Sequence, residues 1–185
     1  MPHTETAVLV LLPEVDEVVG PYRARMDRAA GLGVPAHVTV LYPFVPPDAV
    51  DARVIDALAA AVATVPAFDV TFDRTAWFDD RVLWLAPAPA GPFRDLTRAV
   101  WAGFPAHPPY GGAHDDVIPH LTVGHDVPVD ALRAAAAAIA PRLPVRARVT
   151  RAWLLRGSAE PGSWQRVVDL PLAAGTGEAA GSVEA

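Results

Sequence analysis

Two short segments of the chain carry the same pair of polar residues. Residues 36–40 read Ala-His-Val-Thr-Val, and residues 119–123 read Pro-His-Leu-Thr-Val. One apolar residue separates each histidine from its threonine, so alternation along a β-strand would place the two polar side chains on one face. The apolar neighbours would then face a core on the other side. Each segment therefore predicts a strand that can hold a small anion with an imidazole and a hydroxyl.

Two such strands facing one groove would suit phosphoryl chemistry. Opening a cyclic phosphodiester requires a base that takes a proton from water and an acid that gives one to the departing sugar oxygen. His37 and His120 could fill these roles because imidazoles titrate near neutrality. Thr39 and Thr122 could donate hydrogen bonds to the non-bridging phosphate oxygens. We therefore predict two catalytic histidines, two phosphate-binding threonines, and neither a metal nor a cofactor.

The segments around these strands alternate between strand-like and helix-like patterns. The predicted strands span 7–12, 37–44, 68–78, 82–86, 143–155 and 165–170, and the predicted helices span 14–30, 48–64, 93–104 and 129–140. The first helix should bend near Gly20-Pro21, and Asp48 or Asp51 should cap the second. Residues 68–86 and 143–170 each form a predicted hairpin.

The pattern occurs twice along the chain. In each half, the His-x-Thr strand is followed by a turn with proline and then by a helix. After the helix come an apolar residue followed by proline and a strand that contains Ala-Trp. We predict an α+β class and a duplicated bilobal fold, in which two antiparallel-sheet lobes with flanking helices surround a central groove. Each half would form one lobe. The repeats would span about 7–86 and 87–172 of a single domain, 1–172, and a disordered tail would occupy 173–185.

The composition limits the classes of protein to which the chain could belong. Its 185 residues, 52% of them hydrophobic, suffice for one well-buried domain. The absence of cysteine excludes disulfides and thiolate metal sites. A net charge of −6 argues against duplex DNA as a partner. Because no apolar run of membrane-spanning length and no signal-peptide pattern occurs, we expect a cytoplasmic protein that binds no membrane. We also expect a monomer.

The paired motifs resemble the HxTx signature of the two-histidine (2H) phosphoesterase superfamily. Residues 36–44, Ala-His-Val-Thr-Val-Leu-Tyr-Pro-Phe, are similar to its bacterial 2′-5′ RNA ligase-like, cyclic phosphodiesterase branch, and the resemblance extends over about residues 7–172. It implies a bilobal enzyme with metal-free chemistry on 2′,3′-cyclic phosphates or 2′-5′ phosphodiester linkages, and hence a part in RNA processing. The two histidines and two threonines named above fall on the catalytic positions of this family.

At one position the chain departs from the resemblance. Many RNA-ligase-like relatives have an arginine five residues after the second histidine of the pair, where this chain has His125. A guanidinium, which is always charged and can bind a phosphate through two N–H groups, is thereby replaced by an imidazole, whose charge changes near neutral pH. This change weakens the expectation of RNA-end preference and ligation more than that of cyclic phosphodiester hydrolysis.

Three further residues are candidates for substrate contact: Tyr42, Tyr110 and His125. By alternation, Tyr42 points with the apolar residues of its strand, which favours a core position, and His125 shares this ambiguity. Tyr110 lies in the segment 105–119, which could be a lid with a base-stacking tyrosine or a solvated loop. A metal site at 114–116, His-Asp-Asp, is a minority interpretation, because adjacent residues seldom converge on one ion.

These patterns favour a hydrolase: a metal-independent, 2H-type phosphodiesterase that opens 2′,3′-cyclic phosphates of nucleotides or RNA ends. Reversible 2′-5′ RNA ligation is a further expectation. The alternative is a non-catalytic module that binds a nucleotide or an RNA end in the same groove. A third class, an interaction scaffold, would leave the matched polar pairs without a role.

Overall fold

The strands form two four-stranded antiparallel sheets, which confirms the predicted α+β class and bilobal fold. The computed structural model describes residues 3–113 and 117–175. One sheet has the order β2 (His37–Leu41), β1 (Glu5–Leu11), β7 (Arg151–Gly157) and β8 (Gln165–Pro171). The other has the order β5 (Leu121–His125), β4 (Val82–Ala88), β3 (Phe68–Phe78) and β6 (Val145–Val149).

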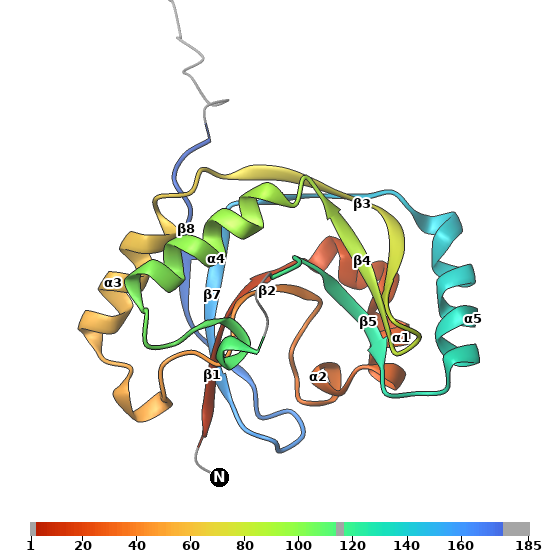
Figure 1. Ribbon diagram of the computed structural model, residues 1–185, viewed down its shortest axis with the longest axis horizontal. Coiled ribbons are helices and arrows are strands. Elements are labelled where there is room, and N and C mark those ends of the chain that lie inside the picture. Colours follow the sequence, from red (N-terminus) through yellow and green to blue (C-terminus); the bar gives the residue numbers. More distant parts are fainter. Residues whose placement is uncertain (1–2, 114–116, 176–185) are drawn as a thin grey trace, which may run out of the picture.

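Helices connect the strands and cover the ends of the molecule. They are α1 (Pro13–Met26), α2 (Arg28–Gly31), α3 (Ala52–Val62), α4 (Gly91–Gly103) and α5 (Val129–Ile139), with short 3-10 turns η1 (Pro47–Ala49), η2 (Pro109–Gly112) and η3 (Ala140–Arg142). The predicted cap Asp51 starts α3 by accepting the Val54 amide at 2.9 Å. Helices α3 and α4 pack together at one end, and α5 lies at the other (Figure 1). None of these helices is long and apolar enough to span a membrane, within the described ranges.

Each sheet takes strands from both halves of the chain. The turn at residues 79–81 is so short that β3 must pair with β4, which confirms the first predicted hairpin. The last two strands of the first half, β3 and β4, therefore lie in the second sheet, whereas β7 and β8 of the second half lie in the first sheet, where β7 pairs with β1. The predicted strand 143–155 is accordingly divided into β6 and β7, which belong to different sheets. The halves therefore do not form one lobe each, as the repeat alone predicts.

The strands β3 and β6 meet at the centre of this exchange. Phe68 lies opposite Val149, and Phe72 lies opposite Val145. The paired segments are therefore symmetrical about the central pair, in which Val70 lies opposite Ala147. Because these strands occupy equivalent places in the two predicted repeats, an approximate twofold axis would pass through this contact.

Helix α1 continues through Gly20-Pro21, where the sequence predicts a bend, as one helix from Pro13 to Met26. Proline has no amide hydrogen, so the Glu17 carbonyl one turn earlier lacks its helical partner. The Arg142 guanidinium, which precedes β6, donates to this carbonyl at 3.1 Å. The helix ends later, where the Asp27 side chain accepts an amide of α2 at 2.9 Å. Arg142 thus supplies the hydrogen bond that Pro21 cannot give to Glu17, and Asp27 marks the end of the helix.

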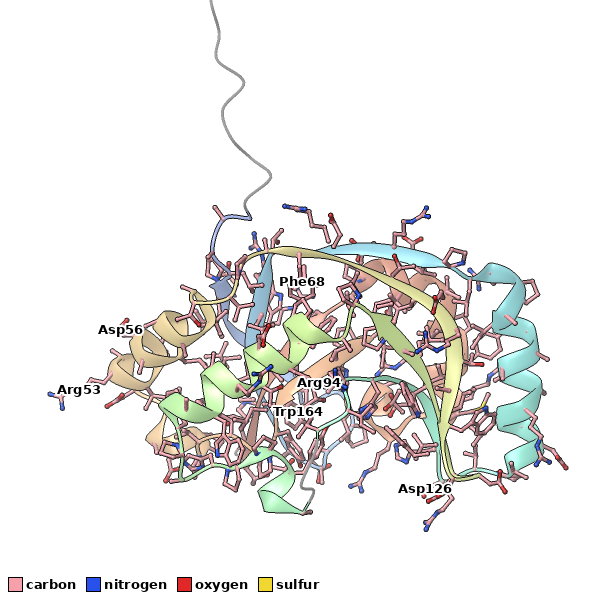
Figure 2. All side chains as sticks on the ribbon, turned by 45° about the horizontal axis from the view of Figure 1, so that its top comes forward. Arg53, Asp56, Phe68, Arg94, Asp126 and Trp164 are labelled. Carbon is pink, nitrogen blue, oxygen red and sulfur yellow. The ribbon has the colours of Figure 1, made fainter. Side chains whose placement is uncertain are left out.

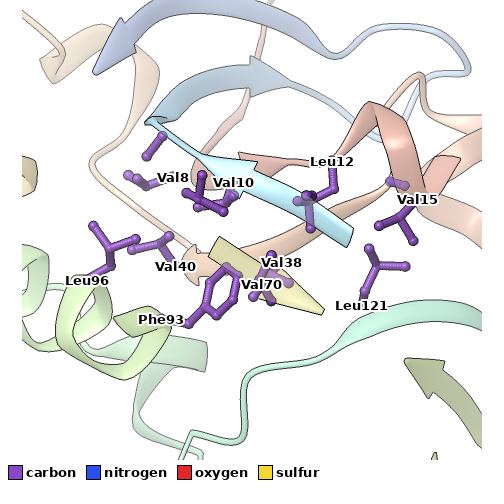
Figure 3. Packing of buried hydrophobic residues seen from close by; sticks show 14 of the residues in the cluster. Val8, Val10, Leu12, Val15, Val38, Val40, Val70, Phe93, Leu96 and Leu121 are labelled. Atoms are coloured by element: carbon purple, nitrogen blue, oxygen red, sulfur yellow. The ribbon is translucent and has the colours of Figure 1, made fainter. Parts of the chain in front are cut away.

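The core lies between the two sheets and the helices that cover them. Its buried side chains include Val8, Val10, Val15, Val38, Val40, Val70, Phe93, Leu96 and Leu121 (Figure 3). Complete burial of a side chain of this size contributes about 1.5–3 kcal/mol. Because β2 and β5 contact each other and share this core, the two His-Thr strands are held at a fixed separation.

The described chain continues slightly beyond the predicted end of the domain. The Ala173 amide donates to the Val65 carbonyl at 2.9 Å, and the Ala67 amide donates to the Ala173 carbonyl at 2.8 Å. These bonds tie the segment after β8 to the start of β3. Residues 176–185, the rest of the expected tail, lie outside the described residues.

Candidate active site

The first His-Thr strand follows the predicted alternation. In β2, Val38 and Val40 are buried in the core, with at most 1% of each exposed. His37 and Thr39 are partly exposed, and both line the same hollow in the surface. The β-branched valines favour the strand and fill the space between the sheets, so the polar pair is presented on the opposite face.

The second strand repeats this arrangement. Leu121 and Val123 of β5 are fully buried. Thr122 is partly exposed and lines a second hollow together with His120, which directly precedes β5. The predicted division between a core face and a polar face is therefore present in both segments.

The two hollows adjoin each other. The first, lined by His37 and Thr39, has a volume of about 330 Å³. The second, lined by His120 and Thr122, has a volume of about 520 Å³. His125 lines both, and both volumes are typical of small-molecule sites. We refer to the first and second hollows together as the groove.

A bulge at the same point of both strands brings one more side chain to the groove. The strand register shifts by one residue at Val40 in β2 and at Val123 in β5, three residues after each histidine. A bulge reverses the alternation that follows it. Tyr42 therefore lines the first hollow, and His125 lines both. The core position that strict alternation favours for Tyr42 is wrong for this reason.

Both catalytic candidates are anchored in the same way. The Nδ1 atom of His37 lies 2.8 Å from the Pro35 carbonyl, and the Nδ1 atom of His120 lies 2.8 Å from the Ile118 carbonyl. A carbonyl oxygen can only accept, so Nδ1 carries the proton and donates it in each ring. In a neutral imidazole the Nε2 atom is then the proton acceptor. Each ring thus has the tautomer that a general base at Nε2 requires.

The surroundings of both rings favour neutral imidazoles. Burial and then the nearby Arg23 charge lower the pKa of His37 from 6.5 to about 4, while the carboxylate of Asp27 opposes the shift. A charge on His120 also lowers the pKa of His37, so the two rings lie close enough to interact. Burial lowers the pKa of His120 as well, and its bond to the Ile118 carbonyl opposes this. Both rings can therefore accept a proton at neutral pH.

This shift predicts a pH-dependent stability that depends on His37. The unfolded residue titrates near 6.5 and the folded one at about 4, so the unfolded chain binds more protons between these values. The free energy of unfolding should therefore decrease as the pH falls from 7 to 4, by about 2–3 kcal/mol from this residue alone. Urea denaturation at both pH values should show a smaller decrease for His37→Gln than for the wild type. An equal decrease in both proteins would contradict the shift.

Tyr110 connects the two hollows. Its side chain is hydrogen-bonded to Thr39 of the first hollow, yet the residue lines the second. Its amide donates to the Tyr42 carbonyl at 2.6 Å, and its φ of 52° is in the left-handed region, which is costly for a residue with a side chain. Burial raises the pKa of Tyr110, and the bond to Thr39 opposes this. The segment that follows α4 thus places a tyrosine at the groove.

Phe78 and Trp84 surround His120, and sequence reasoning missed Trp84. The Phe78 ring lies edge-on to the imidazole, with centroids 5.0 Å apart and planes at 89°. Trp84 lies 5.9 Å away at 67° and stacks on Phe78. These rings exclude water from one side of the imidazole and limit its rotation. The sequence signal for Trp84 was its place in the predicted hairpin, a few residues after the turn that Phe78 precedes.

A buried ion pair behind the first hollow was also missed. Arg23, whose charge favours a surface position, is only 2% exposed. Its Nε and Nη2 atoms donate to one oxygen of Asp27 at 3.0 and 2.7 Å. The other Asp27 oxygen lies 3.5 Å from Nε2 of His125, whose Nδ1 lies 2.8 Å from Asp126 at the end of β5 (Figure 2). His125 is therefore held between two carboxylates.

The described residues contain no evident metal centre. In the ranges 3–113 and 117–175, no three His, Cys, Asp or Glu side chains converge as metal ligands would. The minority interpretation of a metal site concerns residues 114–116, which lie outside the described residues.

Comparison with solved structures shows that the fold is shared with known proteins. Escherichia coli LigT complexed with 3′-AMP is 17% identical, with a TM-score of 0.58, over 92% of this chain and 99% of that one. The protein TT0787 of Thermus thermophilus is 19% identical, with a TM-score of 0.63, over 92% and 98% of the two chains. A structure described as a phosphoesterase is 20% identical, with a TM-score of 0.55, over 92% and 99%. No curated protein matches the chain.

The family comparison agrees with the resemblance of the paired motifs. The family model described as the 2′-5′ RNA ligase superfamily matches residues 11–161, a range that includes both His-Thr strands. Membership supports a function of the phosphoesterase or ligase type. With most of its length matched, including both His-Thr motifs, the chain belongs to the 2′-5′ RNA ligase superfamily, the 2H phosphoesterases.

Proposed function

We propose that the groove opens 2′,3′-cyclic phosphates of nucleotides or RNA ends. The observation that supports this most strongly is the matched anchoring of the two imidazoles, each through Nδ1 to a backbone carbonyl. A threonine accompanies each histidine on the same face of its strand. One phosphate between the two pairs would meet a proton acceptor on one side and a proton donor on the other, as ring opening requires.

His37 is the proposed general base and His120 the proposed general acid. The pKa of about 4 keeps His37 neutral, so its Nε2 atom can take a proton from water. The water oxygen forms a bond with phosphorus as the bond between phosphorus and one ribose oxygen breaks. The bound phosphate anion favours a proton on His120, which passes this proton to the departing oxygen. The products are a phosphomonoester and a free hydroxyl on the same ribose.

Thr39 and Thr122 are the proposed donors to the non-bridging phosphate oxygens. Hydroxyls fixed on strands act where charge accumulates in the transition state and need little reorganisation. Tyr42, Tyr110 and His125 are proposed to contact the rest of the substrate. The nucleotide class is supported by E. coli LigT, a protein of the same fold that has been crystallised with 3′-AMP, ATP and NADP+.

Ligation to a 2′-5′ linkage would use the same histidines in the same roles. A free ribose hydroxyl would then attack the cyclic phosphate in place of water, with proton transfers of the same kind. Ligation also requires the groove to hold a second RNA end. His125, bound between Asp27 and Asp126, offers that end no permanent cation. We therefore propose hydrolysis as the principal reaction.

The direct test is turnover of nucleoside 2′,3′-cyclic monophosphates by the purified protein. We expect a bell-shaped pH dependence of kcat/KM, which reports the free enzyme. The base must be unprotonated, which places the acidic limb at about pH 4. The acid must be protonated, and its lowered pKa places the other limb below 6.5. The optimum should therefore be acidic, and EDTA should not change the rate.

Other outcomes would decide against this proposal. Loss of turnover after EDTA treatment, restored by a divalent metal, would contradict the metal-free mechanism. If no cyclic nucleotide is turned over but 2′- or 3′-nucleotides raise the melting temperature, the groove is a binding module. If neither occurs, the groove does not bind nucleotides.

A further inference from the structure

The first hollow extends away from the phosphate site along two paired strands. Leu9 of β1 lies opposite Thr39 of β2. Glu5, at the start of β1, lies beside Tyr42, beyond the end of β2. At about 3.3 Å per residue, Tyr42 lies about 10 Å along the chain from Thr39, and both residues line the first hollow. The hollow is therefore long enough to continue from a bound phosphate to the base of the same nucleotide.

Two aromatic side chains form one wall of this extension. The rings of Tyr42 and Trp164 have centroids 6.3 Å apart and planes at 57°. Trp164, which follows the loop between β7 and β8 (Figure 2), is fixed because its Nε1 atom donates to the Ser158 carbonyl at 3.1 Å. Its ring also packs on Gly157, where a Cβ would overlap it. A rigid aromatic wall is a surface on which a nucleobase can stack.

Two charged side chains of opposite sign accompany the aromatic wall. The Tyr42 hydroxyl donates to the Oε2 atom of Glu5 at 3.0 Å, which orients this carboxylate. Arg28 of α2 lines the same hollow. Burial and the bond to Glu5 raise the pKa of Tyr42, and the nearby Arg28 charge opposes the rise. A base stacked at Tyr42 would thus have a carboxylate and a guanidinium within reach of its edges.

We infer that the first hollow selects guanine, an inference that rests on the proposed function of the groove. Guanine has two adjacent donors, N1–H and N2–H₂, which match the two oxygens of the Glu5 carboxylate. Its O6 and N7 atoms are acceptors, and an arginine such as Arg28 is the side chain that most often contacts them. Glu5 can accept these donors and still accept the Tyr42 hydroxyl, because each carboxylate oxygen has more than one lone-pair site.

The other three bases fit this pair of charges less well. Adenine and cytosine place a ring-nitrogen acceptor next to their amino group, and this acceptor would face a carboxylate oxygen. Uracil places a carbonyl on each side of its single N–H. Each mismatch leaves a polar group unpaired or brings two acceptors together. Guanine is thus the base whose donors and acceptors agree with both Glu5 and Arg28.

The test compares the four nucleoside 2′,3′-cyclic monophosphates as substrates of the full-length protein. We expect kcat/KM for the guanosine compound to exceed the others by about 10- to 100-fold. Glu5→Gln should remove this preference. The Glu5→Gln variant should also have a higher kcat/KM for the adenosine compound than the wild type has, because a glutamine amide can accept from N6 and donate to N1 of adenine. Glu17→Gln, an exposed residue on α1, is the matched control and should retain the guanine preference.

Binding separates this inference from the proposed reaction. The melting temperature is measured with guanosine 3′-monophosphate and adenosine 3′-monophosphate for the wild type and Glu5→Gln. Turnover without base preference, in a folded wild-type protein, would overturn the guanine site and leave the reaction intact. A larger stabilisation by the guanosine compound, lost in Glu5→Gln, would support the site even if no cyclic phosphate were opened. An unchanged preference in Glu5→Gln would overturn the role of Glu5.

Discussion

Replacing His37 or His120 by alanine should each lower the turnover of a 2′,3′-cyclic nucleotide by about 10²–10⁴-fold, the usual effect of removing a positioned proton donor or acceptor. Both rings are fixed through Nδ1, so each Nε2 atom has one defined role. The double variant should lose much less than the product of the two single effects, because the base and the acid act in one step. Steady-state rates at the pH optimum of the wild type measure all three effects.

The pH profiles of the variants identify which ring is the base. In the wild type, the two limbs belong to the coupled pair of histidines. His37→Ala should remove the acidic limb, and His120→Ala should remove the other. His107→Ala is the matched control, because this ring lies beside Phe44, outside both hollows, and its rate should equal that of the wild type. Full turnover by a folded His37 or His120 variant would exclude the two-histidine mechanism.

Replacing Arg23 by methionine should lower the free energy of unfolding by about 3–5 kcal/mol. The guanidinium makes two hydrogen bonds to Asp27, one to the Val34 carbonyl at 3.3 Å and one to the partly exposed Asp16 at 3.5 Å. The side chains of Arg23 and Asp27 are almost completely buried. Methionine would fill much of the space but would leave the carboxylate buried without its partner, which is the costly part of breaking such a pair. Urea denaturation at pH 7 measures the loss.

A second variant distinguishes the unpaired charge from lost packing. Arg23→Met combined with Asp27→Leu removes both charges and should recover part of the stability, since two apolar side chains can replace a buried ion pair. The recovery should be incomplete, because Asp27 also caps α2. The single Arg23 variant should also raise the pKa of His37, since the guanidinium helps to lower it. Wild-type stability in Arg23→Met would show that the pair contributes nothing to folding.

The parts of the site that could be predicted from the sequence are those set by local geometry. His37 and Thr39 share a face because they are two residues apart in a strand, and the same holds for His120 and Thr122. Burial of Val38 between them follows from its apolar side chain. None of these positions depends on which strand pairs with which, so the paired motif predicted them correctly.

The parts that could not be predicted depend on pairing between distant segments. Tyr42 faces the groove because the strand register shifts at Val40. A valine at this position gives no indication of a bulge. Arg23 is buried because Asp27 one turn later and the Val34 carbonyl accept its N–H groups, whereas its charge alone favours a surface position. The exchange of strands between the halves follows from the length of one turn, at 79–81, and the repeat pattern gives no indication of it.

The exchanged strands also restrict how the molecule can move. In many two-lobed enzymes, each lobe is a separate part of the chain, and a hinge between the lobes opens and closes the site. Here the ladders of β1 with β7, β3 with β6 and β4 with β5 join the two halves, so neither half can swing as a unit without breaking backbone hydrogen bonds. The two sheets in turn share one buried core. Any change in the distance between the two imidazoles would therefore have to come from movement of one sheet over the other across this core, and not from a hinge between the two halves of the chain.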